Sequence, residues 1–443
     1  MKGKISMWLN TDLHCHSGAS GGVGDLSIEK VAETMPLKGI DLIGTGDCFH
    51  PKWRSKLNQI LTESSEGVFT PNFNDKVKFI LQTELIFTCN VETGRKSVHI
   101  VFLLPSFEVI DKILPLLDQW DVKNTIGRPF VKCEDNNDVA QKLHELRKID
   151  DLIEIIPAHV MTPLGVFGSD NPINHLHDFF GDAEELINAV ETGLSADPII
   201  LGMIPELDNR ALISNSDAHS HHLERLGREF TTLNIQELSY PAIIKAIRTN
   251  SIIRTCEFNP SEGRYFLTGH RAGKKGHEKK FCVFSPQFTP KNKICPICGK
   301  KLTIGVLERA FELTIAQDGN RELGFLPPHS RPFVHMVPLI EIIAESHGIK
   351  STTGKKTIGE YQQIVSLLKN ECEMWFMDPE TIESKLNGII EDTLLQAILE
   401  VKKGNFTFEP FGYDGTYGHL RIGEKNDYLN VNIAPKSPQR KLI

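Results

Sequence analysis

The amino-acid sequence predicts an α/β fold over residues 1–258, followed by two smaller segments of different character. Short apolar runs alternate with helical patterns along this first segment, and such alternation favours a parallel sheet covered by helices. Residues with metal-binding side chains stand at or just after the ends of the apolar runs. Because α/β barrels place their active sites at the carboxyl ends of their strands, we expect these side chains to line one mouth.

Eight apolar runs are the candidate strands of the first segment. They span residues 8–14, 40–45, 77–83, 97–104, 152–157, 187–191, 211–214 and 230–235. Three stretches between them have the spacing of amphipathic helices, residues 27–34, 109–120 and 139–147.

The bulk composition is that of an ordinary globular protein, with 443 residues, 40% hydrophobic and 24% charged. No run of 18 apolar residues occurs, so we expect no membrane span. The opening MKGKISMWLNTD lacks the apolar core of a signal peptide. Nine scattered cysteines are typical of reduced thiols, and we therefore expect a cytoplasmic protein. The net charge of −8 does not itself indicate nucleic-acid binding, but the charges are unevenly distributed.

Metal-binding side chains gather in a few short stretches of the first segment. His14 and His16 stand two residues apart, so on a strand they point to the same face. Asp217 and His219 repeat this spacing much later in the chain. Imidazole and carboxylate groups suit Zn, Mn or Fe, and two or more ions could share such a site. In chain order the candidate metal ligands are His14, His16, Asp47, Glu84, His99, His159, Asp217 and His219.

Each candidate also has an ordinary structural interpretation. The two spaced pairs could be capping or surface residues, and Glu84 and His159 could belong to the core or the rim. His99 lies within an apolar run, where a buried, hydrogen-bonded histidine is equally natural. Asp47 could simply end its strand. Glu191 could support a ligand from behind or be an ordinary strand end.

Residues 259–308 form a basic segment with the spacing of a zinc site. Between residues 259 and 301 there are ten basic and two acidic residues. Cys295 and Cys298 form a Cys-x-x-Cys knuckle, followed by a glycine that permits the tight turn. Two upstream residues complete a four-ligand set, so we expect one structural zinc on His270, Cys282, Cys295 and Cys298. Cys256 and His277 are spare candidates.

Residues 309–443 are predicted to be mostly helical, with helices over residues 338–347, 357–372, 379–386 and 391–403. The segment ends in a glycine- and aromatic-rich stretch, residues 411–418. We expect contacts with other parts of the protein, rather than its own periodicity, to order this stretch.

The metal-binding stretches, residues 12–17 and 215–219 with Glu84, His99 and His159, resemble those of the polymerase-and-histidinol-phosphatase (PHP) superfamily. This resemblance implies a distorted (β/α)7 barrel with a two- or three-metal phosphoesterase site. Further stretches, and nearly the whole chain, are similar to the endonuclease Q family: residues 44–47, 51–53, 190–197, 294–300 and 412–418. The implied order is a barrel (1–258), a basic zinc-binding module (259–308) and a mostly helical C-terminal domain with a Gly/Tyr-rich tail (309–443).

The resemblance also implies an activity. Endonucleases of this family hydrolyse the DNA phosphodiester 5′ to a deaminated base (uracil, hypoxanthine or xanthine) or an abasic site. Two or three divalent ions (Zn, Mn or Mg) would bind in the barrel, with Glu84 bridging them. The side chains of His14, His16 and Asp217 would hold one ion, and those of His99 and His159 another. Catalytic roles would fall to Glu84, Asp217, His219 and Asp47, the last two being candidates for a third ion.

DNA containing such lesions is the expected partner. The basic module would follow the phosphate backbone, which predicts strongly salt-dependent binding. The expected DNA contacts are Arg271, Lys274, Lys275, Lys279, Lys280, Lys300 and Lys301, unless these lysines only form a solvated loop. The small-residue loop 17–22 could let a base or backbone approach the metal ligands. No clear sliding-clamp motif of the glutamine-aliphatic-diaromatic kind is present.

The chain departs from its relatives at several positions. Gly22 stands where many PHP proteins carry a ligand of the third metal, and Asp47 stands where many carry histidine. Asp25 or Asp47 could supply the missing ligand. In the zinc module His270 replaces an expected thiolate, and residues 271–280 look like an insertion.

Two other classes of function remain open. One is a small-molecule phosphatase or nonspecific exonuclease on the same metal site, which would leave the basic module unexplained. The other is a non-catalytic DNA-binding scaffold, against which the near-complete ligand set argues.

Overall fold

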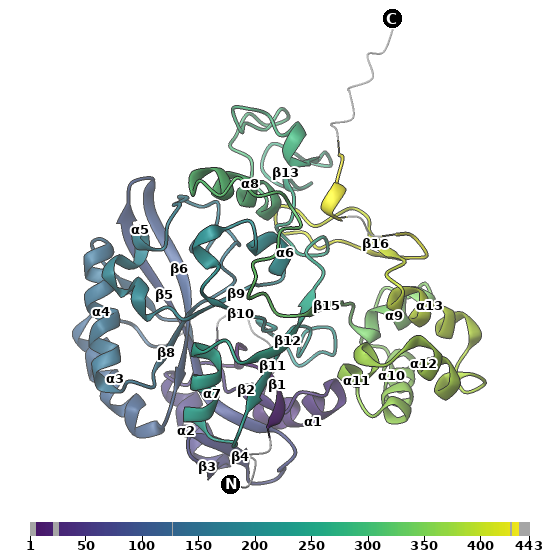
Figure 1. The fold of residues 1–443 in the computed structure, drawn as a ribbon, viewed down its shortest axis with the longest axis horizontal. Helices are drawn as coiled ribbons and strands as arrows, with labels where there is room; N and C mark the ends of the chain where they lie inside the picture. Colours follow the sequence, from purple (N-terminus) through teal and green to yellow (C-terminus); the bar gives the residue numbers. More distant parts are fainter. Residues whose placement is uncertain (1–5, 21–25, 126, 426–427, 434–443) are drawn as a thin grey trace, which may run out of the picture.

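The computed structural model describes residues 6–20, 26–125, 127–425 and 428–433. Gly22 and Asp25, the positions considered for a third metal, therefore lie outside the described residues. Figure 1 shows a barrel part, a small module around β13 at one end of it, and a helical part containing α9 to α13 beside it. The strands of the barrel part are β1 Met7–Asp12, β2 Leu42–Gly44, β3 Leu61–Ser65, β4 Val68–Pro71, β5 Lys78–Val91, β6 Gly94–Leu104, β7 Phe130–Lys132, β8 Glu154–Pro157, β9 Ala189–Glu191, β10 Ala211–Ile213, β11 Phe230–Ile235 and β12 Ile252–Phe258.

The central strands form a distorted ring. β1 pairs with β2 in parallel and with β11 antiparallel, and β2 continues in parallel to β5. β5 then pairs with β6, and β6 with β8, both antiparallel, whereas β9 and β10 form a separate parallel pair. Hydrogen bonds join this pair to the ring, among them one from Val160 N to Glu191 O (3.2 Å) and one from Ser214 N to Thr231 Oγ1 (2.9 Å). The predicted α/β class is confirmed, but the sheet is mixed rather than parallel.

The mixed pairing has a local cause. β5 and β6 form one long hairpin, paired from Leu81↔Leu104 to Val91↔Gly94. Residues 92–93 make its turn, and a two-residue connection can join only antiparallel strands. The apolar runs predicted at 77–83 and 97–104 cover only part of β5 and β6. A strand that is covered on both faces continues for as long as its partner does.

Helices cover the outside of the barrel, and several begin at a residue that caps them. The side chains of Ser106, Asp135 and Ser239 accept hydrogen bonds from backbone N–H groups in the first turns of α3, α4 and α7. In Figure 1, α3 and α4 lie on the outer side of the β5–β6–β8 sheet. The helices and 3-10 turns of this part are α1 Ile28–Lys38, α2 Pro51–Ile60, α3 Phe107–Gln119, α4 Asn136–Ile149, α5 His177–Phe180, η1 Gly181–Leu186, α6 Pro198–Leu201, η2 Pro205–Leu207 and α7 Tyr240–Arg248.

The two faces of the strands bury different apolar clusters. On β6, Val101 and Leu103 face the smaller cluster, while Ile100 and Phe102 face the larger cluster beneath the helices. Side chains alternate along a strand, so His99 shares the face of Val101 and Leu103. On β5, Glu84 likewise shares a face with Ile80, a member of the smaller cluster. The barrel interior therefore supplies an apolar floor below these two polar side chains.

The chain beyond the barrel builds the module and the helical part. β13 and β14 pair antiparallel, with His270 opposite Cys282. β15 then returns to the barrel and pairs in parallel with β12. The remaining elements are β13 Thr268–His270, β14 Cys282–Phe284, η3 Pro286–Phe288, α8 Val306–Ala316, β15 Phe333–Met336, α9 Leu339–Ser346, α10 Lys355–Leu368, α11 Glu371–Phe376, α12 Pro379–Leu386, α13 Asp392–Lys402, β16 Phe406–Phe408, β17 Leu420–Ile422 and η4 Tyr428–Asn430.

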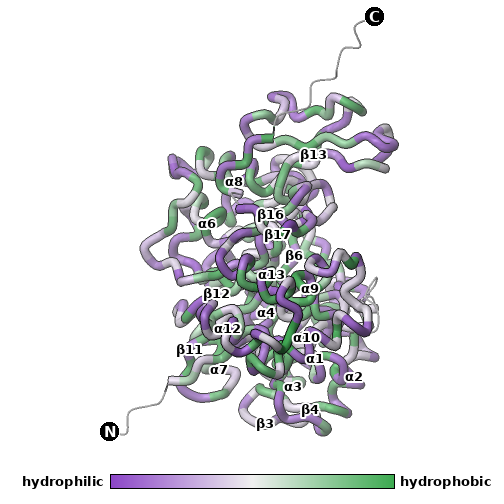
Figure 2. Tube along the Cα trace, turned by 90° about the vertical axis from the view of Figure 1, so that its right-hand side faces the viewer, coloured by the Kyte–Doolittle hydropathy of each residue, from purple (hydrophilic) through white to green (hydrophobic). Residues whose placement is uncertain are grey.

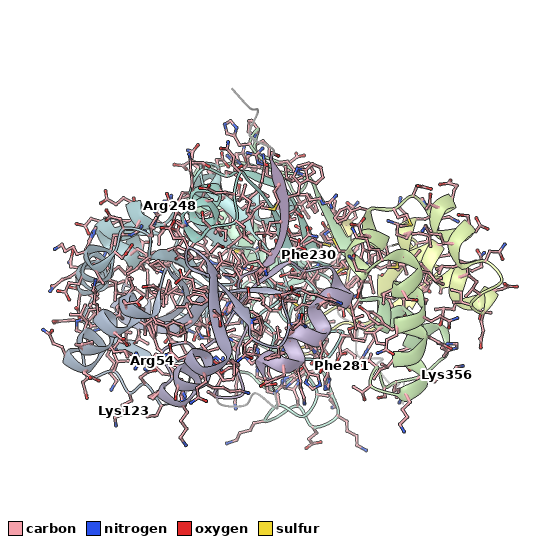
Figure 3. The ribbon with its side chains drawn as sticks, turned by 90° about the horizontal axis from the view of Figure 1, so that it is seen from below. Arg54, Lys123, Phe230, Arg248, Phe281 and Lys356 are labelled. Atoms are coloured by element: carbon pink, nitrogen blue, oxygen red, sulfur yellow. The ribbon has the colours of Figure 1, made fainter. Side chains whose placement is uncertain are left out.

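The helical part agrees with the predicted pattern except at one break. The helix expected over residues 357–372 is divided into α10 and α11. Lys369 has a φ of 80°, which interrupts helical geometry, and Asn370 caps α11 through a hydrogen bond from Glu373 N. From below, Lys356 of the helical part and Arg54 of the barrel part lie at opposite sides of the molecule (Figure 3). Among the described residues, no helix has the length and apolarity needed to cross a membrane.

The glycine- and tyrosine-rich tail is held against the segment that leaves the barrel. Gly412 N donates to Ser261 O (2.8 Å), and Gly418 N donates to Glu262 O (2.8 Å). A Cβ atom at Gly412 would lie 1.9 Å from Gly263 O, so this contact admits only glycine. Figure 2 shows the module around β13 at one end of the molecule, with long hydrophilic stretches in its loops.

Candidate functional site

The turns that follow three strands carry site residues in strained conformations. Asp47, His159 and Asp217, just beyond β2, β8 and β10, have φ angles of 41°, 30° and 45°. Residues other than glycine seldom adopt positive φ, and such conformations cluster at functional sites. Gly193 lets the turn after β9 approach His159, since a Cβ there would lie 2.5 Å from the Cβ of His159.

Two groups of potential ligands meet around Glu84. Among the described residues, His14, His16 and Asp217 form one group, and Glu84, His99 and His159 form the other. Within each, the donor atoms lie within 4.8 Å of one another. Glu84 touches both groups: its Oε1 lies 2.7 Å from His99 Nδ1, and its Oε2 lies 3.6 Å from His16 Nε2.

The buried donor atoms of this cluster are suited to bind a cation. Among the described residues, five buried atoms of the cluster have no hydrogen-bond partner: His14 Nε2, His16 Nε2, His99 Nε2, Glu84 Oε2 and Asp217 Oδ1. Leaving buried polar atoms unpaired costs free energy, on the order of 1–3 kcal/mol each. Imidazole nitrogens and carboxylate oxygens are ligands of Zn and Mn, and carboxylates also suit Mg. The residues present therefore fit divalent ions.

The imidazoles share one orientation. The Nδ1 atoms of His14, His16 and His99 each face a carboxylate, at 3.0 Å from Glu191 Oε1, 3.3 Å from Asp47 Oδ1 and 2.7 Å from Glu84 Oε1, respectively. When a carboxylate accepts the Nδ1 proton, the Nε2 lone pair faces the opposite way and is ready to bind a metal. The cluster is thus arranged as a set of Nε2 ligands.

The carboxylate of Glu191 forms hydrogen bonds with three loops of the site, those that contain His14, His159 and Asn215. Besides His14 Nδ1, it accepts hydrogen bonds from His159 N (2.8 Å) and Asn215 Nδ2 (2.9 Å). Asn215 in turn accepts one from Leu13 N (2.7 Å). Of the two interpretations of Glu191, the geometry supports the carboxylate that orients ligands. Asp12 acts similarly on the loop before Asp217, where its Oδ1 accepts from Ser216 N (2.9 Å).

Asp47 and His219 lie beside the cluster. Asp47 Oδ2 accepts from Ser17 N and Ser17 Oγ (both 2.6 Å), and its Oδ1 faces His16 Nδ1, so Asp47 orients His16 in this structure. The Nδ1 of His219 donates to Asp217 O (2.9 Å), which leaves its Nε2 unprotonated. The assignment of Asp47 and His219 to a third ion, and of catalytic roles to both, stays a prediction.

The electrostatics of the cluster favour positive charge. Burial lowers the pKa of His14, but Glu191, Asp217 and Glu84 outweigh it and raise that pKa to about 9. Burial also lowers the pKa of His16, yet Asp217 and Asp47 raise it to about 10. Conversely, burial raises the pKa of Glu84, while the histidines around it bring it well below its ordinary value. A cation bound here would take the place of these protons.

A cavity of about 480 Å³ opens beside the metal-binding cluster. His99, His159, Asp217 and His219 form part of its wall. The cavity is also lined by several arginines, which were not predicted from the sequence because they come from three separate segments and share no motif. These cavity residues are Arg128, Arg225, Arg228 and Arg264, together with Tyr265 and, from the tail, Tyr417.

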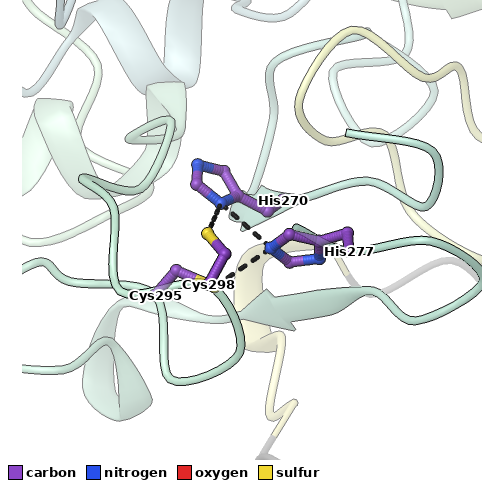
Figure 4. A group of neighbouring side chains, drawn as sticks. All are labelled: His270, His277, Cys295 and Cys298. Atoms are coloured by element: carbon purple, nitrogen blue, oxygen red, sulfur yellow. Dashed lines mark hydrogen bonds between the residues drawn. The ribbon is translucent and has the colours of Figure 1, made fainter. Parts of the chain in front are cut away.

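The module contains a third group of potential ligands, drawn in Figure 4. His270, His277, Cys295 and Cys298 present donor atoms within 4.8 Å of one another. The Nε2 of His277 lies 3.2 Å from both His270 Nδ1 and Cys295 Sγ. Cys282, the predicted fourth ligand, is adjacent, with its sulfur 3.6 Å from Cys295 Sγ. Five potential donors thus lie close together, and the group whose donor atoms all lie within 4.8 Å of one another contains His277 and not Cys282.

Most predicted DNA contacts of the module are exposed. Lys275, Lys279, Lys280, Lys300 and Lys301 all face solvent. The other two are tied to the tail residue Asp414: Lys274 Nζ lies 2.7 Å from its Oδ1, and Arg271 N donates to its Oδ2 (2.8 Å). Asp414 therefore offsets the charge of Lys274 and fixes the basic loop.

No model of a known protein family matches the chain. An uncharacterised protein of Methanocaldococcus jannaschii is 33% identical over 240 residues, which are 52% of this chain and 28% of that protein. The chain thus covers less than a third of the length of this relative. An uncharacterised protein of Bacillus subtilis is 23% identical, over 93% of this chain and 98% of its own.

Two solved structures are similar over almost the whole chain. The lesion-specific endonuclease Q of Pyrococcus furiosus is 27% identical, with a TM-score of 0.75, covering 96% of this chain and 98% of its own. An endonuclease Q bound to a 27-mer duplex with an abasic lesion at its active site is also 27% identical, with a TM-score of 0.78, covering 96% of this chain and 99% of its own.

The barrel, the paired ligand groups and the basic cavity have the architecture of metal-dependent phosphodiesterases. The similarity to the solved structures extends across the barrel, the module and the tail. Over almost its whole length, the chain is similar to solved structures of endonuclease Q.

Proposed function

We propose that the protein is a metal-dependent DNA-repair endonuclease that hydrolyses the phosphodiester 5′ to a deaminated base or an abasic site. The observation that carries this proposal is the pair of ligand groups sharing Glu84 at the edge of a cavity lined by arginines. The full-length similarity to endonuclease Q, including a complex with an abasic duplex, supports the class of substrate.

The chain's own residues would divide the chemistry. His14, His16 and Asp217 would hold one ion, and His99 and His159 a second, with Glu84 between them. Ions bound there supply Lewis-acid charge at the phosphate and make water nucleophilic near neutral pH. Glu191 and Asp47 keep the imidazoles oriented, which lowers the cost of forming the site. The arginines of the cavity would balance the phosphate's charge as it increases during attack.

Substrate selection would depend on extruding the damaged nucleotide. A deaminated or abasic position pairs weakly, so removing it from the duplex costs less than removing a normal base. The cavity beside the ligands has room for such a group, about 480 Å³. The exposed lysines of the module would follow the phosphate backbone and hold the duplex while this occurs.

A paired assay separates the three possible functions. We would measure hydrolysis of p-nitrophenyl phosphate and histidinol phosphate beside nicking of a duplex with a single uracil, hypoxanthine or abasic site. Lesion-dependent nicking with little phosphatase activity is the expected result. Phosphatase activity that exceeds nicking would support the small-molecule enzyme, and tight DNA binding without either activity would support the scaffold.

The domain division is also part of this proposal: a barrel (1–258), a zinc module (259–308) and a C-terminal domain (309–443). Strand β15 of the C-terminal domain pairs with the barrel strand β12, so this domain also contacts the barrel sheet.

All nine cysteines, each within the described residues, are free thiols. Such thiols fit the reducing cytoplasm in which we propose that the protein works.

A further inference from the structure

The tail contributes a side chain to the cavity beside the metal-binding cluster. Tyr417 lines this cavity together with Asp217 and His219, although it lies two hundred positions further along the chain than Asp217. It is half-buried, whereas its neighbour His419 is exposed and does not line this cavity. The glycines on either side, Gly415 and Gly418, belong to the turn that brings the phenol ring there.

Three arginines are arranged around this phenol. Arg228 Nη1 donates to Tyr417 Oη (3.4 Å). The guanidinium of Arg225 lies 4.9 Å from the ring centroid, and that of Arg264 lies 5.6 Å from it. Burial raises the pKa of Tyr417, but Arg228 and Arg225 outweigh burial and lower it, in keeping with a phenol oxygen surrounded by cations.

The arginines are also fixed from the protein side. Arg228 is buried, and its Nε donates to Ser216 O (3.1 Å), the residue before the ligand Asp217. Arg264 Nε donates to Gly415 O (3.2 Å) in the same tail. Three like charges gathered around one ring repel each other, and the ring, together with the carboxylates of Asp217 and Glu229 near Arg228, offsets part of that repulsion. An anion in the cavity would offset more of it.

We propose that Tyr417 is a positioning residue, which holds Arg225, Arg228 and Arg264 as a clamp for a phosphate group of the substrate strand next to the scissile bond. The planar guanidinium group can bind two phosphate oxygens through bidentate hydrogen bonds, so its orientation determines its affinity for phosphate. A long arginine side chain loses rotamer entropy on binding unless it is already ordered. Tyr417 would order all three side chains before the substrate arrives. This proposal rests on the proposed function and gives the tail a role in binding.

The test measures binding without turnover. In a Glu84→Gln background, we would titrate a short duplex carrying one abasic site at several salt concentrations. Each phosphate contact contributes about −0.9 to the slope of log K against log[salt]. Tyr417→Leu should make the slope shallower by about one or more such contacts and weaken binding at least tenfold at 0.1 M salt. Tyr417→Phe keeps the ring and should retain the slope, with a smaller loss of affinity.

Two further variants keep the test decisive. His419→Ala, in the same tail but outside this cavity, should bind as the parent protein does. Arg225→Gln should reduce the slope without altering the tail, and Tyr417→Leu in that background should have a smaller effect than it has alone, because the two residues act on one contact. If Tyr417→Leu proves poorly folded, Tyr417→Phe takes its place in both backgrounds, and its smaller loss of affinity is compared in the same way.

The outcomes are separable from those of the proposed function. A Tyr417→Leu variant with the parent's slope and affinity would overturn the clamp. So would additive effects of Arg225→Gln and Tyr417→Leu. A wild-type protein that nicks no lesion duplex would overturn the proposed function, while the salt slopes would still decide whether Tyr417 positions a phosphate clamp.

Discussion

Glu84 is the residue on which both ligand groups depend, because its two oxygens face different histidines. The change Glu84→Gln preserves its size and removes its charge. We expect nicking to fall by roughly 10²–10³-fold or more, as when one group that stabilises transition-state charge is lost. Asp217→Asn should act similarly. Turnover close to wild type with added Mg or Mn would rule out the assignment, and Glu66→Gln, at an exposed glutamate, is the matched control.

A second prediction concerns a buried carboxyl behind the site. Burial raises the pKa of Glu257 to about 7, despite hydrogen bonds from Ser214 and Thr255. The folded protein therefore holds this proton to higher pH than the unfolded chain does. Between about pH 4.5 and pH 7 the unfolded chain binds fewer protons, so the contribution of Glu257 to the free energy of unfolding falls as pH rises.

The change Glu257→Gln removes this titration. Relative to the wild type, the variant should gain about 3 kcal/mol of unfolding free energy from pH 4.5 to pH 8, as expected for a shift of about 2.5 pKa units. Denaturant unfolding at several pH values measures the difference. The same difference at every pH would show that Glu257 ionises normally in the folded protein.

At the scale of elements, the spacing of residues in the sequence does not determine which side chains complete the proposed zinc site of the module. The Cys-x-x-Cys knuckle predicts a metal-binding module, since its two thiolates are close in the chain. The other ligands come from the β13–β14 hairpin and its loop, where the fold, rather than the spacing, brings His277 next to His270. For this reason His277 could be predicted from the sequence only as a spare candidate.

Loss of this zinc should unfold the module and leave the barrel intact. Cys295→Ser should remove one zinc per chain and weaken DNA binding, because a module of this size has little apolar core without its metal. The barrel metals and the main thermal transition should persist. Metal content and DNA affinity measured on the same variant are the test, and unchanged zinc would contradict it.

Comparison of His277→Ala with Cys282→Ser identifies the fourth ligand. From the donor distances we expect the zinc content to fall with the histidine variant and to remain near one per chain with the cysteine variant. The opposite pattern would show that Cys282, the residue predicted from the sequence, is the fourth ligand.

At the scale of the whole molecule, a buried ion pair connects the helical part to the barrel. Lys38 of α1 and Glu371 of α11 lie 2.7 Å apart, and neither side chain is exposed to solvent. Glu371 also accepts from Leu339 N (2.9 Å) and Tyr361 Oη (2.7 Å), so it organises the surrounding helices as well. The contact lies between residues more than three hundred positions apart, beyond what local pattern can predict.

Removing one partner of this pair should be costly. Lys38→Met leaves the charge of Glu371 buried without its cation, which typically costs about 3–5 kcal/mol. Lys38→Met combined with Glu371→Gln keeps the hydrogen bonds to Leu339 and Tyr361 and should recover most of that loss. Denaturant unfolding of the two variants gives the comparison. If the double variant is no more stable than the single, the pair is not the source of the effect.

Features of the fold that depend on local sequence could be predicted, whereas those that depend on contacts between distant segments could not. Alternating apolar runs and helical patterns are local, so they predicted the α/β class and the positions of His14 and His16 just after a strand. Glu84 and His99, also expected near strand ends, instead lie inside the long strands β5 and β6. Pairing direction and register depend on contacts between distant segments, so the β5–β6 hairpin and the ring closure were not predicted. The arginines of the cavity were likewise not predicted, because only folding brings Arg225, Arg228 and Arg264 to Tyr417.

The position of the nick tests the central claim most directly. A duplex labelled at one 5′ end, with a single abasic site or uracil in that strand, would be incubated with wild-type protein, with and without a chelator. The claim predicts one metal-dependent nick immediately 5′ to the lesion, an intact undamaged duplex, and no product from Glu84→Gln. Degradation of undamaged DNA at a similar rate, or nicking that survives both the chelator and the variant, would contradict it.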